Sequence, residues 1–254
     1  MKRIGTLLFL LCGMFVSVQA QTAEEIVSNY LENIGGEEAL RGITTMKMSA
    51  KVDAQGMVLP VTVITQKDGK SRTSFELQGN EIVQQAFDGE TGWGINFMTQ
   101  KAEPMETEDV ENLKREMQDY PDPFIDYEKK GYSIELLGKE TIEGVECFKL
   151  NLTKNPMLVN GEEVENVVTY YFDVDNFVPI VSEQIIMSGE MKGKISQTIY
   201  SDYQEVEGMY FPFYIENKVK GMDGGQPITF EKIELNLTFE DSIFMMPEET
   251  ETKE

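Results

Sequence analysis

The chain has 254 residues, with 22 basic and 45 acidic side chains and no histidine, which gives a formal net charge of −23 at pH 7. A chain this acidic is not expected to bind nucleic acid or to adsorb to an anionic membrane surface. The absence of histidine excludes Ser-His-Asp and Cys-His catalysis and removes the commonest ligand of transition metals.

The first twenty residues have the pattern of a secretory signal peptide. Lys2 and Arg3 precede an apolar run over residues 4–18, and the small residue Ala20 ends the segment. The run is shorter than the roughly 20 residues needed to span a bilayer, so the pattern favours cleavage after Ala20 over a retained anchor. Cleavage would remove two positive charges, giving a net charge of −25, and would leave Cys147 as the only cysteine, so no internal disulfide is expected.

Residues 22–34 predict an amphipathic helix, because Thr22 and Glu25 can form a capping box and apolar residues recur at helical spacing until Gly35. From Thr44 the apolar period changes to two, which is typical of a half-buried strand running through residues 46–52. Further strands are predicted at residues 58–66, 71–77, 81–87, 92–98, 132–137, 145–153, 167–173, 177–187, 194–203, 209–219 and 228–237.

Residues 105–131 interrupt the strand pattern. Thr107 can cap a helix with acidic residues in its first turn, and Val110, Leu113 and Met117 form one apolar stripe along it. Prolines at positions 121 and 123 end this helical pattern. We therefore predict a helical cover over one face of the sheet, which moves as a lid.

About twelve strands joined by short turns are too many for a flat open sheet. The sequence predicts a mainly β fold with a few helices: a strongly curved antiparallel sheet, or half-barrel, that encloses a hydrophobic cavity covered by helices. One domain is expected over residues 21–247. Residues 248–254 contain no apolar side chain and predict a disordered acidic tail.

No residue pattern in the sequence indicates catalysis or metal binding. Cys147 lies on the strand face opposite Phe148 and Leu150, which favours a structural thiol over a nucleophile. The acidic residues are numerous enough to form chance carboxylate pairs, and none sits in a glycosidase signature. Residues 173–176 begin like a calcium loop but lack its glycine and terminal glutamate, so a turn is the better interpretation. We expect no enzyme activity, no cofactor and no metal.

The positive signal is apolar. Successive strands and the predicted cover carry bulky apolar residues that would line a concave face, and thirteen methionines remain after cleavage, which suits a surface that adapts to variable ligands. The competing interpretation is that these side chains only fill an irregular core. The candidate ligand-binding residues are Met46, Met48, Val52, Phe75, Leu77, Trp93, Ile95, Phe97, Val110, Leu113, Met117, Phe148, Leu150, Tyr170 and Phe172.

Several segments resemble the LolA-like group of outer-membrane lipoprotein-sorting proteins. These segments are residues 26–40 (IVSNYLENIGGEEAL), 43–48 (ITTMKM), 86–93 (AFDGETGW), 137–140 (LGKE) with Glu143-Gly144, 200–203 (YSDY) and 208–212 (GMYFP). The resemblance implies a curved sheet around a hydrophobic cavity, closed by helices. It also implies a periplasmic protein, since family members shield lipoprotein acyl chains between the inner and outer membranes.

Two functions remain open at this point. The first is a monomeric periplasmic carrier whose cavity holds lipoprotein acyl chains or lipid, with envelope membrane proteins as further partners. The alternative is a sensory or scaffolding module that binds another envelope protein through its convex sheet or acidic surface. An enzyme ranks third, because nothing in the sequence supplies its catalytic groups.

Overall fold

The computed structural model describes residues 21–54 and 56–247, so the predictions of a signal peptide and of an acidic tail lie outside the described residues. The described chain forms one antiparallel sheet of 13 strands, with helices α1 (Ala23–Asn33), α2 (Glu37–Arg41) and α3 (Thr107–Met117) and a 3-10 turn, η1 (Asp241–Ile243). The strands are β1 (Thr45–Ala54), β2 (Met57–Gln66), β3 (Ser71–Leu77), β4 (Asn80–Phe87), β5 (Gly92–Asn96), β6 (Lys101–Pro104), β7 (Ser133–Ile142), β8 (Val145–Val159), β9 (Glu162–Asp173), β10 (Pro179–Ile185), β11 (Ile195–Val206), β12 (Met209–Val219) and β13 (Gln226–Leu235). The mainly β fold with a strongly curved sheet is confirmed.

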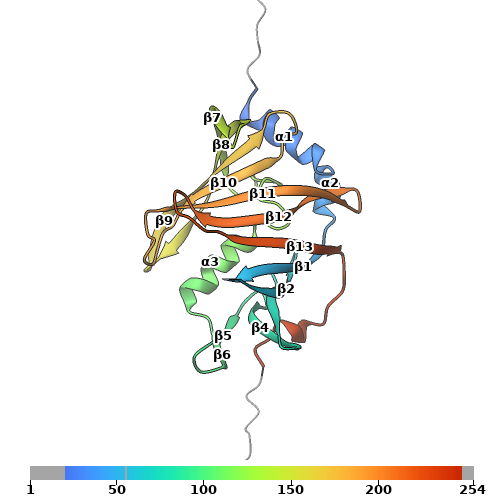
Figure 1. The fold of residues 1–254 in the computed structure, drawn as a ribbon, viewed down its shortest axis with the longest axis vertical. Coiled ribbons are helices and arrows are strands. Elements are labelled where there is room, and N and C mark those ends of the chain that lie inside the picture. Colours follow the sequence, from blue (N-terminus) through green and yellow to red (C-terminus); the bar gives the residue numbers. More distant parts are fainter. Residues whose placement is uncertain (1–20, 55, 248–254) are drawn as a thin grey trace, which may run out of the picture.

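The sheet consists of two meanders, β1–β6 and β7–β13. The first strand of one pairs with the last strand of the other in the middle of the sheet. The strand order is β6-β5-β4-β3-β2-β1-β13-β12-β11-β10-β9-β8-β7, so β1 pairs with β13 while β6 and β7 form the two edges. Figure 1 shows the first meander below the second, with α3 between β9 and β5. Residues 105–132 thus carry the chain from one edge of the sheet to the other.

The strand limits differ from the prediction mainly where apolar alternation is weak. Strand β6 was missed because Ala102 is its only alternating apolar residue, and residues 97–98 belong to the turn before β6 instead of β5. Strands β8 and β9 extend further than predicted and meet at the Asn160-Gly161 turn. Both turn residues have positive φ, as expected of a tight hairpin.

Helix α1 has the predicted capping box: the Glu25 backbone N–H donates to Thr22 Oγ1 at 3.2 Å, and the Thr22 backbone N–H donates to Glu25 Oε2 at 3.0 Å. Its apolar face, including Ile26 and Tyr30, is buried. Helix α3 forms where it was predicted, but Thr107 is its first helical residue instead of its cap: Glu106 is the N-cap, and its side chain makes no capping bond. None of the residues of α3 is buried. In the part of the chain that the structure describes, every helix is too short or too polar to cross a bilayer.

The main core lies between helix α1, residues 120–132 and the concave face of the sheet. On β8 and β9, Leu150, Leu152 and Phe172 are completely inaccessible to solvent, and the core continues onto β1, β12 and β13 through Met46, Phe213, Ile233 and Leu235. A second, smaller core lies on the convex face, where Cys147, Tyr171 and Val181 pack together.

Candidate functional site

A central cavity of about 290 Å³ lies where the main core ends, between helix α1, residues 121–124 and the concave sides of β1, β9, β11 and β12. Most of its wall is apolar. The cavity is lined by Tyr30, Ile34, Leu40, Met46, Met48, Pro121, Asp122, Pro123, Phe124, Tyr170, Pro179, Tyr200, Tyr203, Tyr210, Phe211 and Pro212. Its volume is at the lower end of the range for pockets that bind small molecules, about 300–1,000 Å³.

The polar part of this wall consists of tyrosines and one carboxylate. Tyr30 donates its hydroxyl proton to Asp122 Oδ2 at 2.6 Å, and the Phe124 backbone N–H donates to Asp122 Oδ1 at 2.9 Å. Burial raises the pKa of Asp122, although both hydrogen bonds oppose that shift. Burial also raises the pKa of Tyr170, Tyr200 and Tyr203, so these phenols are neutral donors and acceptors at physiological pH.

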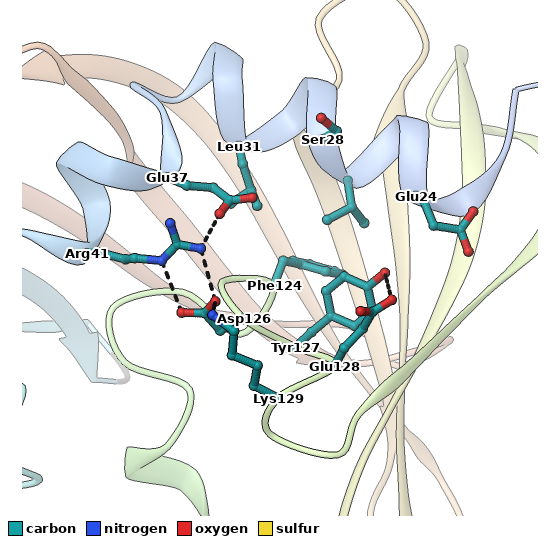
Figure 2. Close-up of a pocket in the computed structure, with 11 residues that line it drawn as sticks. Glu24, Ser28, Leu31, Glu37, Arg41, Phe124, Asp126, Tyr127, Glu128 and Lys129 are labelled. Atoms are coloured by element: carbon teal, nitrogen blue, oxygen red, sulfur yellow. Dashed lines mark hydrogen bonds and ion pairs between the residues drawn. The ribbon is translucent and has the colours of Figure 1, made fainter.

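Residues 119–132 form a cover that is tied to both the helices and the sheet. Figure 2 shows Arg41 of α2 reaching Asp126 of the cover with two hydrogen bonds, Nε to Oδ2 and Nη2 to Oδ1, each 3.0 Å long. On the sheet side, Lys154 of β8 donates to Asp119 Oδ2 at 2.7 Å. Phe124 separates the central cavity from a surface pocket of about 310 Å³ between the cover and α1, since it lines both.

The apolar concave face continues from the cavity along β1, β2 and β13, and we call this face the groove. Met46, Met48 and Val52 alternate on the concave face of β1, and their register partners on β2 and β13 extend the same face. Met46 and Ala50 are buried on this face, but most of its other apolar side chains are half buried, in contrast to Leu150 and Phe172 on β8 and β9. The half-buried set includes Met48, Val52, Val61, Val63, Phe75, Ile215, Ile228 and Phe230.

Helix α3 forms the opposite wall of this groove, and it is held mainly by polar contacts to the β8–β9 hairpin. Asn112 Nδ2 donates to the Leu158 carbonyl and Asn112 Oδ1 accepts from the Leu158 N–H, both at 2.8 Å. Glu108 accepts from the backbone N–H groups of Asn160 and Gly161, at 3.0 and 2.6 Å. A pocket of about 460 Å³ lies beneath α3 and has a mixed lining: Leu113, Met105 and Met157 are apolar, whereas Gln85, Asp109, Asn112 and Glu116 are polar. The helix spans a space that its own side chains do not fill.

The candidate residues from the sequence separate into four groups in the structure. Met46, Met48 and Tyr170 line the cavity, while Phe148, Leu150 and Phe172 belong to the filled core behind it. The remaining concave and cover residues lie along the groove or at its exposed rim. These are Val52, Phe75, Leu77, Phe97, Val110, Leu113 and Met117.

Trp93 and Ile95 require a correction, because the structure places both on the convex face. Residues that pair across neighbouring strands lie on the same face of the sheet. Trp93 pairs with Ala86, Ala86 with Arg72, Arg72 with Ile64, and Ile64 with Lys47, which lies on the face opposite Met46. The Trp93 indole donates to the Phe244 carbonyl at 3.1 Å, so the C-terminal segment covers it. A bulge in β4 next to the Ser74–Val83 pair shifts the alternation by one residue, which exchanges the two faces beyond it.

Several cavity residues were not among the sequence candidates. Tyr200, Tyr203 and residues 210–212 lie in segments that the family resemblance singled out, but they were interpreted there as strand-edge and turn sequences. Asp122 stands between Pro121 and Pro123, and an acidic residue fixed between two prolines in an otherwise apolar cover was the signal available for it. Tyr30 was assigned to the buried stripe of α1, which is correct, and its hydroxyl reaches Asp122 as well.

The cysteine, aspartate and glutamate side chains that the structure describes form no metal site, because no three of them are placed to hold a metal ion. Cys147 is completely buried, and burial raises the pKa of its thiol to about 11. The thiol is therefore protonated and inaccessible at neutral pH.

Several solved structures share this fold, although neither a family model nor a curated protein sequence matches the chain. A LolA superfamily protein from Nitrosomonas europaea aligns with a TM-score of 0.54 and 16% identity, covering 89% of this chain and 98% of that one. A DUF1329 family protein from Desulfovibrio piger aligns at 0.50 and 10%, covering 89% and 98%. A putative outer membrane lipoprotein-sorting protein domain from Vibrio parahaemolyticus aligns at 0.50 and 10%, covering 86% and 97%. The predicted resemblance in fold is confirmed.

Proposed function

We propose that this protein is a carrier that holds a hydrophobic ligand, lipoprotein acyl chains or free lipid, in the cavity and groove of its half-barrel. The observation that carries the proposal is the half-buried apolar concave face opposite α3. Monomeric proteins rarely leave a contiguous apolar surface of this kind uncovered unless it binds something. We propose no catalytic role, because Tyr30, whose hydroxyl is bonded to the Asp122 carboxylate, has a pKa that burial raises well above its usual value.

The dimensions of the groove suit an extended alkyl chain. At about 3.3 Å per residue, the stretch of β1 from Met46 to Val52 spans about 20 Å. Each methylene removed from water contributes about 0.8 kcal/mol, so a chain that fills even half of this length binds with useful affinity. Methionines at the cavity end, Met46 and Met48, can adjust their side chains to different acyl shapes.

We place the protein in the periplasm, on the basis of the signal-peptide pattern in residues 1–20 and the fold it shares with lipoprotein-sorting proteins. Mass measurement of the protein from a periplasmic fraction tests this, and a chain that starts at Gln21 is the expected result. A full-length chain that stays in the cytoplasm would contradict export.

Two substitutions on neighbouring residues of β2 test the groove. Val63 pairs with Met48 and faces the groove, whereas Thr62 pairs with Ser49 and faces the convex side. Both side chains are half buried, so Val63→Asp and Thr62→Asp add the same charge at similar exposure on opposite faces. We expect Val63→Asp to weaken binding of a palmitoylated peptide at least tenfold and Thr62→Asp to change it less than twofold.

Binding is measured by calorimetry, after native mass spectrometry of gently purified protein has shown what co-purifies. Thermal unfolding of both variants serves as the folding control, and Leu113→Asp on α3 replaces Val63→Asp if the latter does not fold. Equal binding by the two β2 variants, or an apo protein that takes up neither lipid nor acylated peptide, would overturn the carrier proposal.

A further inference from the structure

The polar groups that line the central cavity limit which part of a ligand can bind there. The polar side chains of this cavity come from five separate elements: Tyr30 from α1, Asp122 from the cover, Tyr170 from β9, Tyr200 and Tyr203 from β11, and Tyr210 from β12. All of these groups are oxygens. No lysine or arginine belongs to the lining of this cavity, whose residues all lie in the described part of the chain.

Asp122 is the one acidic residue in that lining, and its carboxyl group retains room for another donor. A carboxylate has about four acceptor positions, and the Tyr30 hydroxyl and the Phe124 N–H occupy two of them. The nearby Lys130 ammonium donates to the Asp122 and Pro123 carbonyls, at 3.2 and 3.5 Å, instead of to the carboxylate. Within residues 21–247, none of the ion pairs of the structure includes Asp122.

The tyrosine hydroxyls add no positive charge. Tyr203 uses its proton for the Pro179 carbonyl at 2.7 Å, and Tyr200 shares a hydrogen bond of 2.8 Å with Ser182 Oγ. Tyr203 therefore offers a ligand only lone pairs. A second carboxylate or a phosphate placed here would lie beside Asp122 in an apolar enclosure whose lining contains no cation, and the nearby Lys130 ammonium is already directed at two backbone carbonyls, so burying a second anion here is unfavourable.

From this arrangement we infer that the central cavity receives an uncharged, hydrogen-bond-donating group of the ligand, such as a hydroxyl or an amide N–H next to the acyl chain, and rejects carboxylate and phosphate groups. The acyl chain then extends from the cavity along the groove beneath α3. This inference rests on the proposed carrier function and specifies the ligand class within it. Free fatty acids and lipids that must bury an anionic headgroup in the cavity are excluded.

Two ligands with the same sixteen-carbon chain test the inference without any mutation. Monopalmitoylglycerol presents hydroxyl donors and palmitate presents a carboxylate, and both are titrated calorimetrically below their micellar concentrations at pH 7.5. The titrations are done in 0.3 M NaCl, because salt at this level screens the distant acidic surface. We expect monopalmitoylglycerol to bind at least tenfold more tightly than palmitate.

A matched pair of variants then assigns this preference to Asp122. Asp122→Asn keeps an acceptor for Tyr30 and removes the carboxylate. We therefore expect the affinity for palmitate to come within about threefold of the affinity for monopalmitoylglycerol. Glu183→Gln makes the same change at a buried carboxylate on the convex face, where Glu183 bonds Tyr171 and Gln197, and should leave the tenfold preference intact.

The possible results separate the inference from the function on which it rests. Binding of neither ligand by the wild-type protein overturns the carrier proposal. Equal binding of both ligands, or a preference that survives in Asp122→Asn, overturns the inference and leaves a carrier without headgroup selection. If Asp122→Asn does not fold, Tyr200→Phe takes its place. The loss of this hydroxyl should weaken the binding of monopalmitoylglycerol and leave the binding of palmitate unchanged. The reverse result would contradict the inference.

Discussion

Individual residues of the same chemical type have different roles depending on which face of the sheet they occupy. Asp122 and Glu183 are both enclosed carboxylates, yet burial raises the pKa of Asp122, whereas hydrogen bonds from Lys220 and Gln197 outweigh burial and lower the pKa of Glu183. The difference lies in the partners, since Glu183 has a lysine and Asp122 has only neutral donors on its carboxylate. This makes Glu183 a structural group and leaves Asp122 available to a ligand.

Cys147 provides a prediction at the residue scale. Burial raises its pKa to about 11 from a usual value of 9.0, so ionisation alone should make its alkylation about 100-fold slower than that of a free thiol. We expect no detectable labelling of the chain from Gln21 onward by iodoacetamide at pH 8 within an hour, and complete labelling in 6 M guanidinium chloride. Rapid labelling of the native protein would show that the convex core opens.

Helix α3 and the cover formed by residues 119–132 differ as elements, although the sequence predicts one mobile cover for both. The cover contributes buried side chains such as Phe124 and Ile125 to the main core and is fixed by the Arg41–Asp126 pair. Helix α3 contributes no buried residue and depends on side-chain bonds to the β8–β9 hairpin. Lid motion is therefore a prediction for α3 and no longer for the cover.

Hydrogen exchange tests this division. Because α3 buries little apolar surface, we expect its amides to exchange at least tenfold faster than those of β8 and β9, and ligand to slow them. Asn112→Ala removes both bonds to Leu158 and should accelerate exchange further, whereas Glu111→Gln on the same helix should not. Exchange in α3 as slow as in the sheet core would contradict the lid.

At the scale of the whole molecule, the two halves of the concave face differ in burial. The half formed by β7–β9 is filled by helix α1 and the cover, and the same core continues onto β1, β12 and β13 through Met46, Phe213, Ile233 and Leu235. Farther along β1–β3, β12 and β13 most concave apolar side chains are half buried, and we propose that this part binds the ligand. Natural proteins give up some stability where a surface must remain free to bind.

Substitutions in each half should show this division. Leu150 is completely buried, so Leu150→Ala should lower the free energy of unfolding by about 2–5 kcal/mol. Val63 is half buried in the groove, so Val63→Ala should cost about 1 kcal/mol or less in the absence of ligand. Urea unfolding measures both, and a loss for Val63→Ala as large as that for Leu150→Ala would mean that the groove is part of the closed core.

The sequence alone determined what depends on neighbours along the chain. The capping box of α1, the alternation of Met46 and Met48 on β1, and the hairpin turns at residues 143–144 and 160–161 all follow from local spacing and backbone preference. The curved antiparallel sheet follows from the number of strands and the shortness of their turns.

Which faces of these helices and strands contact one another depends on the tertiary structure. The pairing of β1 with β13 joins residues almost 190 positions apart, and the bulge in β4 places Trp93 on the convex face. The hydrogen bond between Tyr30 and Asp122 joins residues 92 positions apart. Such contacts depend on the closure of long loops and on register shifts of one residue, neither of which leaves a periodic trace in the sequence. For this reason the apolar character of the site could be predicted, whereas its carboxylate could not.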